Sequence, residues 1–175
     1  MQASVFIGTS VDGFIARPDD KLDFLPADGG EPHGYIEFFA SIDTILIGRR
    51  TFEIVLAFPE WPYGDKRVVV LSSRALDLSS ASAHRIEQMS GSPAEIAAKL
   101  AASGVQHVYV DGGVTIQQFL RAGLIQRLTI TRVPVLIGQG IPLFGTLLQD
   151  IRLRHIATQS YPSGLVKTEY EVLNE

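Results

Sequence analysis

Short apolar runs rich in β-branched residues alternate along the chain with segments whose apolar residues recur every three or four positions. The first kind of segment is typical of buried strands, and the second is typical of helices packed on a sheet. Strands are predicted at residues 4–8, 44–48, 67–71, 107–110 and 127–133. Helices are predicted at residues 35–40, 50–57, 93–103 and 114–122. Because apolar strands that alternate with helices form mostly parallel sheets covered on both faces, the pattern predicts an α/β fold.

The last part of the chain has a different pattern. Two alternating runs between residues 152 and 173 flank Pro162, Ser163 and Gly164, which are residue types that favour a turn. This arrangement predicts an antiparallel hairpin at one edge of the sheet. A chain of 175 residues also has the size of one typical domain, so we expect residues 1–175 to form a single domain.

Composition and charge exclude several classes of function. The 15 basic and 19 acidic residues give a net charge of −4, and without a basic block we expect no binding to nucleic acid. The absence of cysteine excludes a thiol nucleophile and a Cys-ligated zinc site, and we expect no metal. No apolar run is long enough to cross a membrane, and the first residues lack the features of a signal peptide, so a cytoplasmic location is expected.

A pair of glycines lies between a predicted strand and a predicted helix. Gly112 and Gly113 follow the strand at 107–110 and precede the helix at 114–122. A helix that begins at the carboxyl end of a parallel strand points its free N–H groups toward an anion, and side chains there would obstruct the approach of a phosphate. The motif D-G-G also occurs in ordinary tight turns, so this pair alone allows either interpretation.

A second predicted strand runs into Gly48, Arg49, Arg50 and Thr51 at the start of a helix. Arginine is disfavoured near a helix N-terminus because of the helix dipole, and a bound anion would compensate for this mismatch. The alternative is that both arginines lie in solvent and pair with Glu53.

A third predicted strand is followed by Ser72, Ser73 and Arg74. Two hydroxyls and a guanidinium could hold a ribose phosphate, although a serine turn with a surface arginine would have the same sequence. Three strand ends suited to phosphate favour one extended anionic ligand, for which a dinucleotide is the natural candidate. Cationic groups for a 2′-phosphate favour NADPH over NADH.

The order of these motifs resembles the dihydrofolate reductase fold, in which the segments matching GRRTFE, LSSR and DGG also follow strands. The segment VPVLIGQGIPLF at residues 133–144 is more specific, and it is similar to the reductase domain of bacterial riboflavin biosynthesis, the RibD C-terminal domain family. The resemblance implies a three-layer α/β/α fold with a mostly parallel central sheet and a C-terminal antiparallel hairpin. The zinc deaminase motifs H-x-E and P-C-x-x-C do not occur in the sequence, so we expect a stand-alone reductase domain.

The resemblance also implies roles in cofactor binding. Residues 48–51 would hold the cofactor phosphates, and residues 72–74 would hold the 2′-phosphate end of the adenosine. In that family a segment after the first strand meets the nicotinamide, and the glycine pair lies under the diphosphate, where we expect a cis peptide bond between the two glycines. The residues expected to contact these parts of the cofactor are Ile15, Ala16, Gly112, Gly113, Val114 and Thr115.

The catalytic groups are less clearly marked. True dihydrofolate reductases carry a carboxylate on the first helix, and the position that corresponds here is Pro32, beside Glu31. Glu31 and Asp23 are therefore candidate catalytic acids, and each would also suit a surface carboxylate or a helix cap. Thr131 resembles a strand threonine that forms a hydrogen bond near the substrate, and an ordinary strand former would explain it equally well.

The resemblance implies an NADPH-dependent reductase of a small heterocycle, in that family 5-amino-6-(5-phosphoribosylamino)uracil. A phosphate on the substrate would need its own cation, for which Arg17, Lys21 and Arg132 are candidates. Because the first-helix acid is missing, NADPH binding without turnover is an alternative. Dihydrofolate reductase activity is a third alternative, which the same absence disfavours. Dimers are common among such domains, so we also expect a homodimer whose contact includes the C-terminal region near Tyr170.

Overall fold

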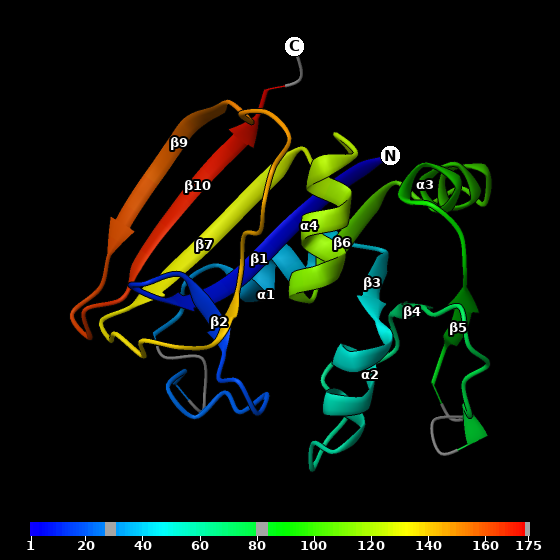
Figure 1. Ribbon diagram of the computed structural model, residues 1–175, viewed down its shortest axis with the longest axis horizontal. Helices are drawn as coiled ribbons and strands as arrows, with labels where there is room; N and C mark the ends of the chain where they lie inside the picture. Colours follow the sequence, from blue (N-terminus) through cyan, green and yellow to red (C-terminus); the bar gives the residue numbers. More distant parts are fainter. Residues whose placement is uncertain (27–30, 80–83, 174–175) are drawn as a thin grey trace.

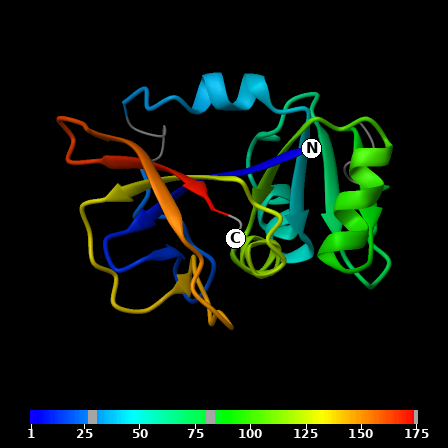
Figure 2. The ribbon, with the colours of Figure 1, turned by 90° about the horizontal axis from the view of Figure 1, so that it is seen from above.

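The computed structural model describes residues 1–26, 31–79 and 84–173 (Figure 1). The strands are β1 (Gln2–Ser10), β2 (Phe14–Ala16), β3 (Thr44–Gly48), β4 (Arg67–Leu71), β5 (Ile86–Met89), β6 (His107–Asp111), β7 (Arg127–Val133), β8 (Ile141–Pro142), β9 (Leu153–Ser160) and β10 (Val166–Val172). The helices are α1 (Tyr35–Ser41), α2 (Arg49–Leu56), α3 (Pro93–Ala102) and α4 (Gly113–Arg121). Helix α1 lies on one side of the central sheet and α4 on the other (Figure 2), which confirms the predicted three-layer α/β/α fold.

The central sheet has the strand order β5-β4-β3-β6-β1-β7-β10-β9. Neighbouring strands from β5 to β7 are parallel, whereas β10 is antiparallel to both β7 and β9. The C-terminal hairpin and the mostly parallel sheet are therefore as the sequence predicts. Because β6 is inserted between β3 and β1, the carboxyl ends of these three strands lie side by side.

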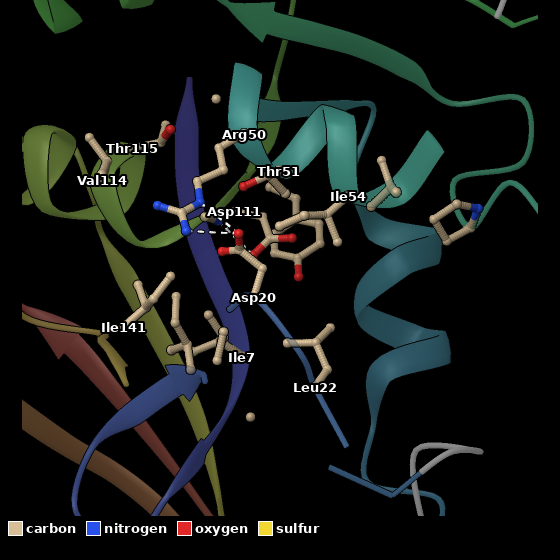
Figure 3. Close-up of a pocket in the computed structure, with 18 of the residues that line it drawn as sticks. Ile7, Asp20, Leu22, Arg50, Thr51, Ile54, Asp111, Val114, Thr115 and Ile141 are labelled. Carbon is tan, nitrogen blue, oxygen red and sulfur yellow. Dashed lines mark hydrogen bonds and ion pairs between the residues drawn. The ribbon is translucent and has the colours of Figure 1, made fainter. Parts of the chain in front are cut away.

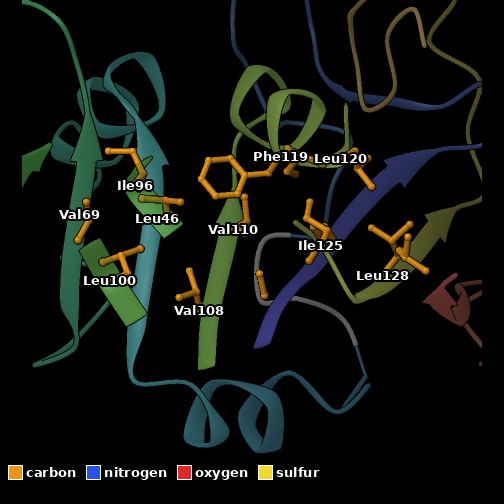
Figure 4. Packing of buried hydrophobic residues seen from close by; sticks show 14 of the residues in the cluster. Leu46, Val69, Ile96, Leu100, Val108, Val110, Phe119, Leu120, Ile125 and Leu128 are labelled. Atoms are coloured by element: carbon orange, nitrogen blue, oxygen red, sulfur yellow. The ribbon is translucent and has the colours of Figure 1, made fainter. Parts of the chain in front are cut away.

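The sheet is buried on both faces because its central strands are mostly apolar. On one face, Leu46 and Val110 of the sheet pack against Ile96 of α3 and Phe119 of α4, and each of these side chains is at most 1% exposed (Figure 4). On the other face, Tyr109 belongs to a second cluster that includes residues of α1 and α2. Neighbouring residues of β6 thus enter opposite cores, which explains the lack of apolar and polar alternation in these strands.

Helix α3 begins at Pro93, as the sequence predicts. The backbone N–H of Glu95 donates to the Ser92 hydroxyl at 3.3 Å, and the Glu95 carboxylate accepts from the Ser92 N–H at 2.7 Å. This reciprocal pair is a capping box, which satisfies N–H groups that a helix start leaves free.

Three strands have no counterpart in the sequence-based prediction. Strand β5 alternates poorly because Glu87 and Gln88 stand between its two apolar residues, and it pairs only with β4 at the outer edge of the sheet. Strands β2 and β8 form a separate two-stranded sheet, and they contain only three and two residues. Alternation of apolar and polar residues cannot be recognised in segments this short, so the sequence pattern does not predict these strands.

Candidate functional site

A cavity of about 580 Å³ lies at the carboxyl ends of β1, β3, β4 and β6 (Figure 3). Its wall also includes residues of α2, the start of α4 and the segment between β2 and α1. Most of these side chains are apolar. The cavity is lined by most of the residues predicted to bind the cofactor, namely Ile15, Ala16, Gly48, Arg49, Arg50, Thr51, Gly112, Val114 and Thr115.

Two of the predicted phosphate-binding turns are in close contact. A Cβ atom built on Gly112 would overlap the Thr51 hydroxyl, and one built on Gly48 would lie 3.0 Å from the Oγ1 of Thr115. Gly113 is less confined, since its Cβ would lie 3.1 Å from the Cδ1 of Ile15. A side chain at Gly112 would therefore need the surroundings to shift, because the turns after β3 and β6 approach each other so closely.

Helices α2 and α4 both begin at this contact without a side-chain cap. Their N-cap residues are Gly48 and Gly112, and neither helix start receives a hydrogen bond from a capping side chain. In this respect they differ from α3, which has a complete capping box. The free N–H groups of the first turn of a helix favour an anion. Two such helix starts lie at the cavity.

The expected cis peptide bond between Gly112 and Gly113 is not observed, because the described chain contains no cis peptide bond. The turn after β6 is made instead by a positive φ of 88° at Gly112, a backbone conformation that glycine adopts without steric cost. This part of the prediction was wrong.

Both arginines at the start of α2 form ion pairs. Arg49 contacts Glu53 at 3.1 Å, and Arg50 contacts Asp20 at 2.7 Å (Figure 3). The Arg49 pair is the surface interaction considered above as an alternative to anion binding. Exposed pairs of this kind contribute about 0 to 1 kcal/mol, so a phosphate could replace the carboxylates at small cost.

The segment after β4 forms a local turn. The Ser72 hydroxyl donates to the carbonyl of Arg74 at 2.7 Å and accepts from the Arg74 N–H at 3.1 Å. Ser73 and Arg74 are exposed. Leu71, the last residue of β4, lines the cavity, so this turn lies directly beside it. The serine turn is thus formed, and the guanidinium of Arg74 is accessible to a ligand.

The cavity contains a carboxyl group that was not among the candidate catalytic acids. Asp111 is the last residue of β6, and its side chain points into the cavity (Figure 3). Its Oδ1 accepts the Gly112 N–H at 2.7 Å. Burial raises the pKa of Asp111, while the Gly112 N–H and the Tyr63 hydroxyl act in the opposite direction. Burial together with the charge of Asp111 raises the pKa of nearby Tyr35 to about 12.

The sequence contains a signal for Asp111, since an acid ends a run of buried apolar residues immediately before the two glycines. The glycines drew attention to the backbone of this motif. The side chain before them is the group that faces the cavity.

The predicted catalytic residues lie elsewhere. Glu31 accepts hydrogen bonds from the N–H and hydroxyl of Ser163 in the C-terminal hairpin, which lowers its pKa. Asp23 pairs with Arg17 at 2.5 Å, and this contact lowers the pKa of Asp23. Thr131 is 5% exposed, and its hydroxyl has no hydrogen-bond partner among the described residues. None of the three predicted residues lines the cavity.

No group of three or more His, Asp or Glu side chains in residues 1–26, 31–79 and 84–173 could hold a metal ion. In the same part of the chain, every helix is too short or too polar to cross a membrane.

The comparison with known families identifies the chain. The model of the RibD C-terminal domain matches residues 4–167. The chain belongs to the RibD C-terminal domain family. The resemblance noted in the sequence is thereby confirmed, and membership of this family supports a reductase.

Two relatives extend along almost the whole chain. YwjB of Bacillus subtilis (strain 168) is 30% identical over 160 residues, which is 90% of each chain. A structure from Shewanella sp. PV-4, assigned to riboflavin biosynthesis, is 36% identical and has a TM-score of 0.91, with coverage of 99% of this chain and 100% of that one.

A more distant structure shares the fold. The deaminase and 5-amino-6-(5-phosphoribosylamino)uracil reductase of Thermotoga maritima has a TM-score of 0.77 at 12% identity. The match covers 98% of this chain and 56% of that one.

The close contact at Gly112 gives a first prediction. Gly112→Ala combines an unfavourable φ, which costs about 1 to 3 kcal/mol, with overlap against Thr51. Gly104→Ala is a matched control, because Gly104 has a φ of 87° and no atom within 4 Å of its Cβ position. In urea unfolding we expect Gly112→Ala to lower the free energy of unfolding by at least about 1 kcal/mol more than Gly104→Ala does. Equal losses of unfolding free energy in the two variants would show that Thr51 leaves room for a side chain at Gly112.

The environment of Asp111 gives a second prediction. Because burial raises its pKa, the native protein binds this proton more tightly than the unfolded chain, so ionisation costs stability above the native pKa. Asp111→Asn should therefore raise Tm near neutral pH by about 2 to 4 °C, and the gain should shrink as the pH falls through the native pKa toward the ordinary value. Thermal scans at several pH values test this. The prediction is contradicted if the Tm difference between Asp111→Asn and the unmodified protein does not change with pH. It is also contradicted if Asp65→Asn, at an exposed site, raises Tm equally.

Proposed function

We propose that the protein is an NADPH-dependent reductase of the riboflavin biosynthesis type that acts on a small heterocycle. The observation that carries this proposal is the meeting of two uncapped helix starts, at Gly48 and Gly112, on one cavity beside two arginines. Free N–H groups and guanidinium groups together bind phosphates well. The carboxyl ends of neighbouring parallel strands are also where ligands bind in open α/β sheets.

The residues present fit a dinucleotide. Gly112 lines the cavity and carries no side chain that would stand between its backbone and a diphosphate. Thr51 and Thr115 add hydroxyls, and Arg50 adds a cation that the Asp20 carboxylate now neutralises. When bound, NADPH would supply the hydride. Arg74 would bind the 2′-phosphate, and Ile15 and Ala16 would contact the nicotinamide.

The chain itself would orient the substrate and exclude water. The wall around Asp111 includes Phe6, Tyr63 and Tyr109, which are 7%, 4% and 5% exposed. Such an enclosure strengthens hydrogen bonds to a bound ring, because little water competes for them. A carboxyl group in the cavity also weakens the case for binding without turnover, which depended on a missing acid.

Cofactor preference tests the proposal. NADPH should bind more tightly than NADH by about 1.5 to 3 kcal/mol for each charge-assisted contact to the 2′-phosphate. Arg74→Ala should reduce the difference in binding free energy between NADPH and NADH. Arg127→Ala, at the amino end of β7, should leave this difference unchanged. Calorimetric titration of both cofactors measures this directly. Equal dissociation constants in the unmodified protein would overturn the assignment of NADPH.

We also propose a homodimer that forms through the C-terminal hairpin. Strand β9 is the last strand of the sheet, all of its residues are exposed, and its outer edge has unpaired backbone groups. Leu148, Leu153 and Ile156 are 97%, 39% and 41% exposed in this region. Tyr170 packs partly against the core of its own chain, so the contact would depend on β9.

Light scattering at micromolar concentration tests the dimer. We expect twice the 19.1 kDa of one chain, because a closed pair would cover the apolar edge. Ile156→Asp should restore the mass of one chain, whereas Ile36→Asp on α1 should not. A mass of one chain in the unmodified protein would reject the dimer.

A further inference from the structure

A short loop places a carboxylate beside the helix start that is proposed to bind phosphate. Asp20 lies in the segment between β2 and α1, and it lines the cavity. Its Oδ2 accepts hydrogen bonds from the Nε and Nη2 of Arg50, at 2.9 and 2.7 Å (Figure 3). A phosphate oxygen makes the same kind of contact with an arginine. The carboxylate of Asp20 therefore occupies a position on Arg50 that a phosphate would take.

The conformation of Asp20 is unfavourable in two respects. Among the described residues other than glycine, Asp20 alone has a positive φ, which is 67°. This backbone region is uncommon for residues with a side chain, although Asn and Asp adopt it more readily than most. The second carboxylate oxygen, Oδ1, is buried and has no hydrogen-bond partner among the described residues. A buried acceptor without a partner costs free energy. Both features make the contact with Arg50 easier to replace than its short distances suggest.

The loop that carries Asp20 is held together by its own contacts. The N–H of Arg17 donates to the carbonyl of Lys21 at 2.9 Å, and the N–H of Asp20 donates to the carbonyl of Arg17 at 3.0 Å. The side chain of Arg17 also pairs with Asp23 at 2.5 Å. We call residues 17–23 the strap. None of these contacts involves α2, so the strap can keep its shape when Asp20 leaves its partner on that helix.

The charges on the wall of the cavity make Asp20 a direct competitor of an anion. Among the described residues that line the cavity, the charged ones are Asp20, Arg49, Arg50 and Asp111. Their formal charges cancel when both carboxyl groups are ionised. Removal of Asp20 would leave Arg50 without its partner and would give the wall one further positive charge. A phosphate or diphosphate supplies at least this much negative charge, whereas an uncharged ligand supplies none.

We propose that Asp20 is an internal competitor for the phosphate site, and that a ligand with a phosphate or diphosphate group binds by displacing its carboxylate from Arg50. Leu22 lies on the strap and also lines the cavity, so this part of the wall moves with Asp20. The contact lowers the affinity for anions and selects those whose negative charge exceeds that of one carboxylate. This inference rests on the proposed function, because the phosphate site at the start of α2 is part of it.

Inorganic diphosphate tests the competition directly, because it carries the anionic group without a nucleotide. Asp20→Asn removes the competing charge with little change in shape, and Asn also tolerates a positive φ, so the strap should keep its conformation. Loss of an ion pair of this kind corresponds to up to about a fivefold change in affinity. In calorimetric titration at low ionic strength, we therefore expect Asp20→Asn to bind diphosphate at least about threefold more tightly than the unmodified protein.

Asp19→Asn is the matched control. Asp19 lies on the same strap and pairs with Lys21 at 2.6 Å, but it is exposed and does not line the cavity. Both variants change the net charge equally, and we expect Asp19→Asn to change the Kd of diphosphate by less than about twofold. A gain of affinity cannot result from unfolding. A gain below about threefold in Asp20→Asn, or an equal gain in Asp19→Asn, would overturn the proposal.

A double-mutant cycle tests whether Asp20 acts through Arg50. Arg50→Gln removes the guanidinium, so diphosphate should bind more weakly to this variant. In the Arg50→Gln background, Asp20→Asn should give no measurable gain in affinity, because the cation for which carboxylate and phosphate compete is gone. An equal gain in both backgrounds would show that Asp20 repels anions without occupying their position, and this would refute the proposal.

Failure of this inference differs from failure of the proposed function. If NADPH binds while Asp20→Asn leaves the affinity for diphosphate unchanged, the reductase function stands and the competition is wrong. The competition is also wrong if diphosphate binds neither to the unmodified protein nor to Asp20→Asn. If neither NADPH nor NADP⁺ binds while Asp20→Asn still raises the affinity for diphosphate, the competition stands and the proposed cofactor is wrong.

Discussion

The structure of the site depends on the close contact between the turn after β6 and the start of α2. Gly112 has no space for a side chain against Thr51, and Gly48 has almost none against Thr115. Because β6 lies between β3 and β1, this contact brings two helix N-termini to the same place. The presence of two helix N-termini without side-chain caps at the cavity therefore follows from strand order and from two glycines. A side chain at Gly112 would overlap the Thr51 hydroxyl, so the residues at this contact would have to shift.

The ion pairs at the start of α2 are a consequence of the same geometry. A helix N-terminus with two arginines has an excess of positive charge, and Asp20 and Glu53 now compensate for it. The Arg49–Glu53 pair is exposed, and exposed pairs are weak and sensitive to salt, whereas the Asp20 side chain of the other pair is only 26% exposed. A diphosphate would provide more negative charge and better geometry than either carboxylate. The pairs are therefore compatible with a site that exchanges them for a ligand.

The sequence predicted the fold well because buried parallel strands and amphipathic helices leave strong periodic signals. The helix start at Pro93 and the hairpin around Gly164 were predicted from local chemistry alone, since caps and turns involve only a few consecutive residues. Strands β5, β2 and β8 were missed because they are short or polar and are defined by their partners. The expected cis peptide bond between Gly112 and Gly113 was wrong, because that expectation came from the family resemblance and not from the residues of this chain.

The site was predicted less completely, for a physical reason. Residues expected to bind through their backbone, such as Gly112, can be recognised in the sequence because glycine at a strand end lacks a side chain that would obstruct a ligand. The direction of a side chain depends on which face of the strand it occupies, and this required the register of β6. Tyr109 and Asp111 are two residues apart and therefore face the same side, toward α1 and α2. Glu31, which was a candidate because it lies beside the position given by the family spacing, accepts hydrogen bonds from Ser163 at the hairpin instead.

Asp111 destabilises the protein when it ionises, and it also offers hydrogen-bond acceptors to a ligand in the cavity. Strand β3 ends at the cavity in Gly48 and β4 in Leu71, so a strand end in this sheet does not require a charged residue. A carboxyl group whose pKa is raised by burial destabilises the protein when it ionises. A ligand that donates N–H groups to it would remove part of this cost on binding, and its affinity would include that gain. An anionic ligand would increase the cost. Asp111 thus favours ligands that donate hydrogen bonds to it.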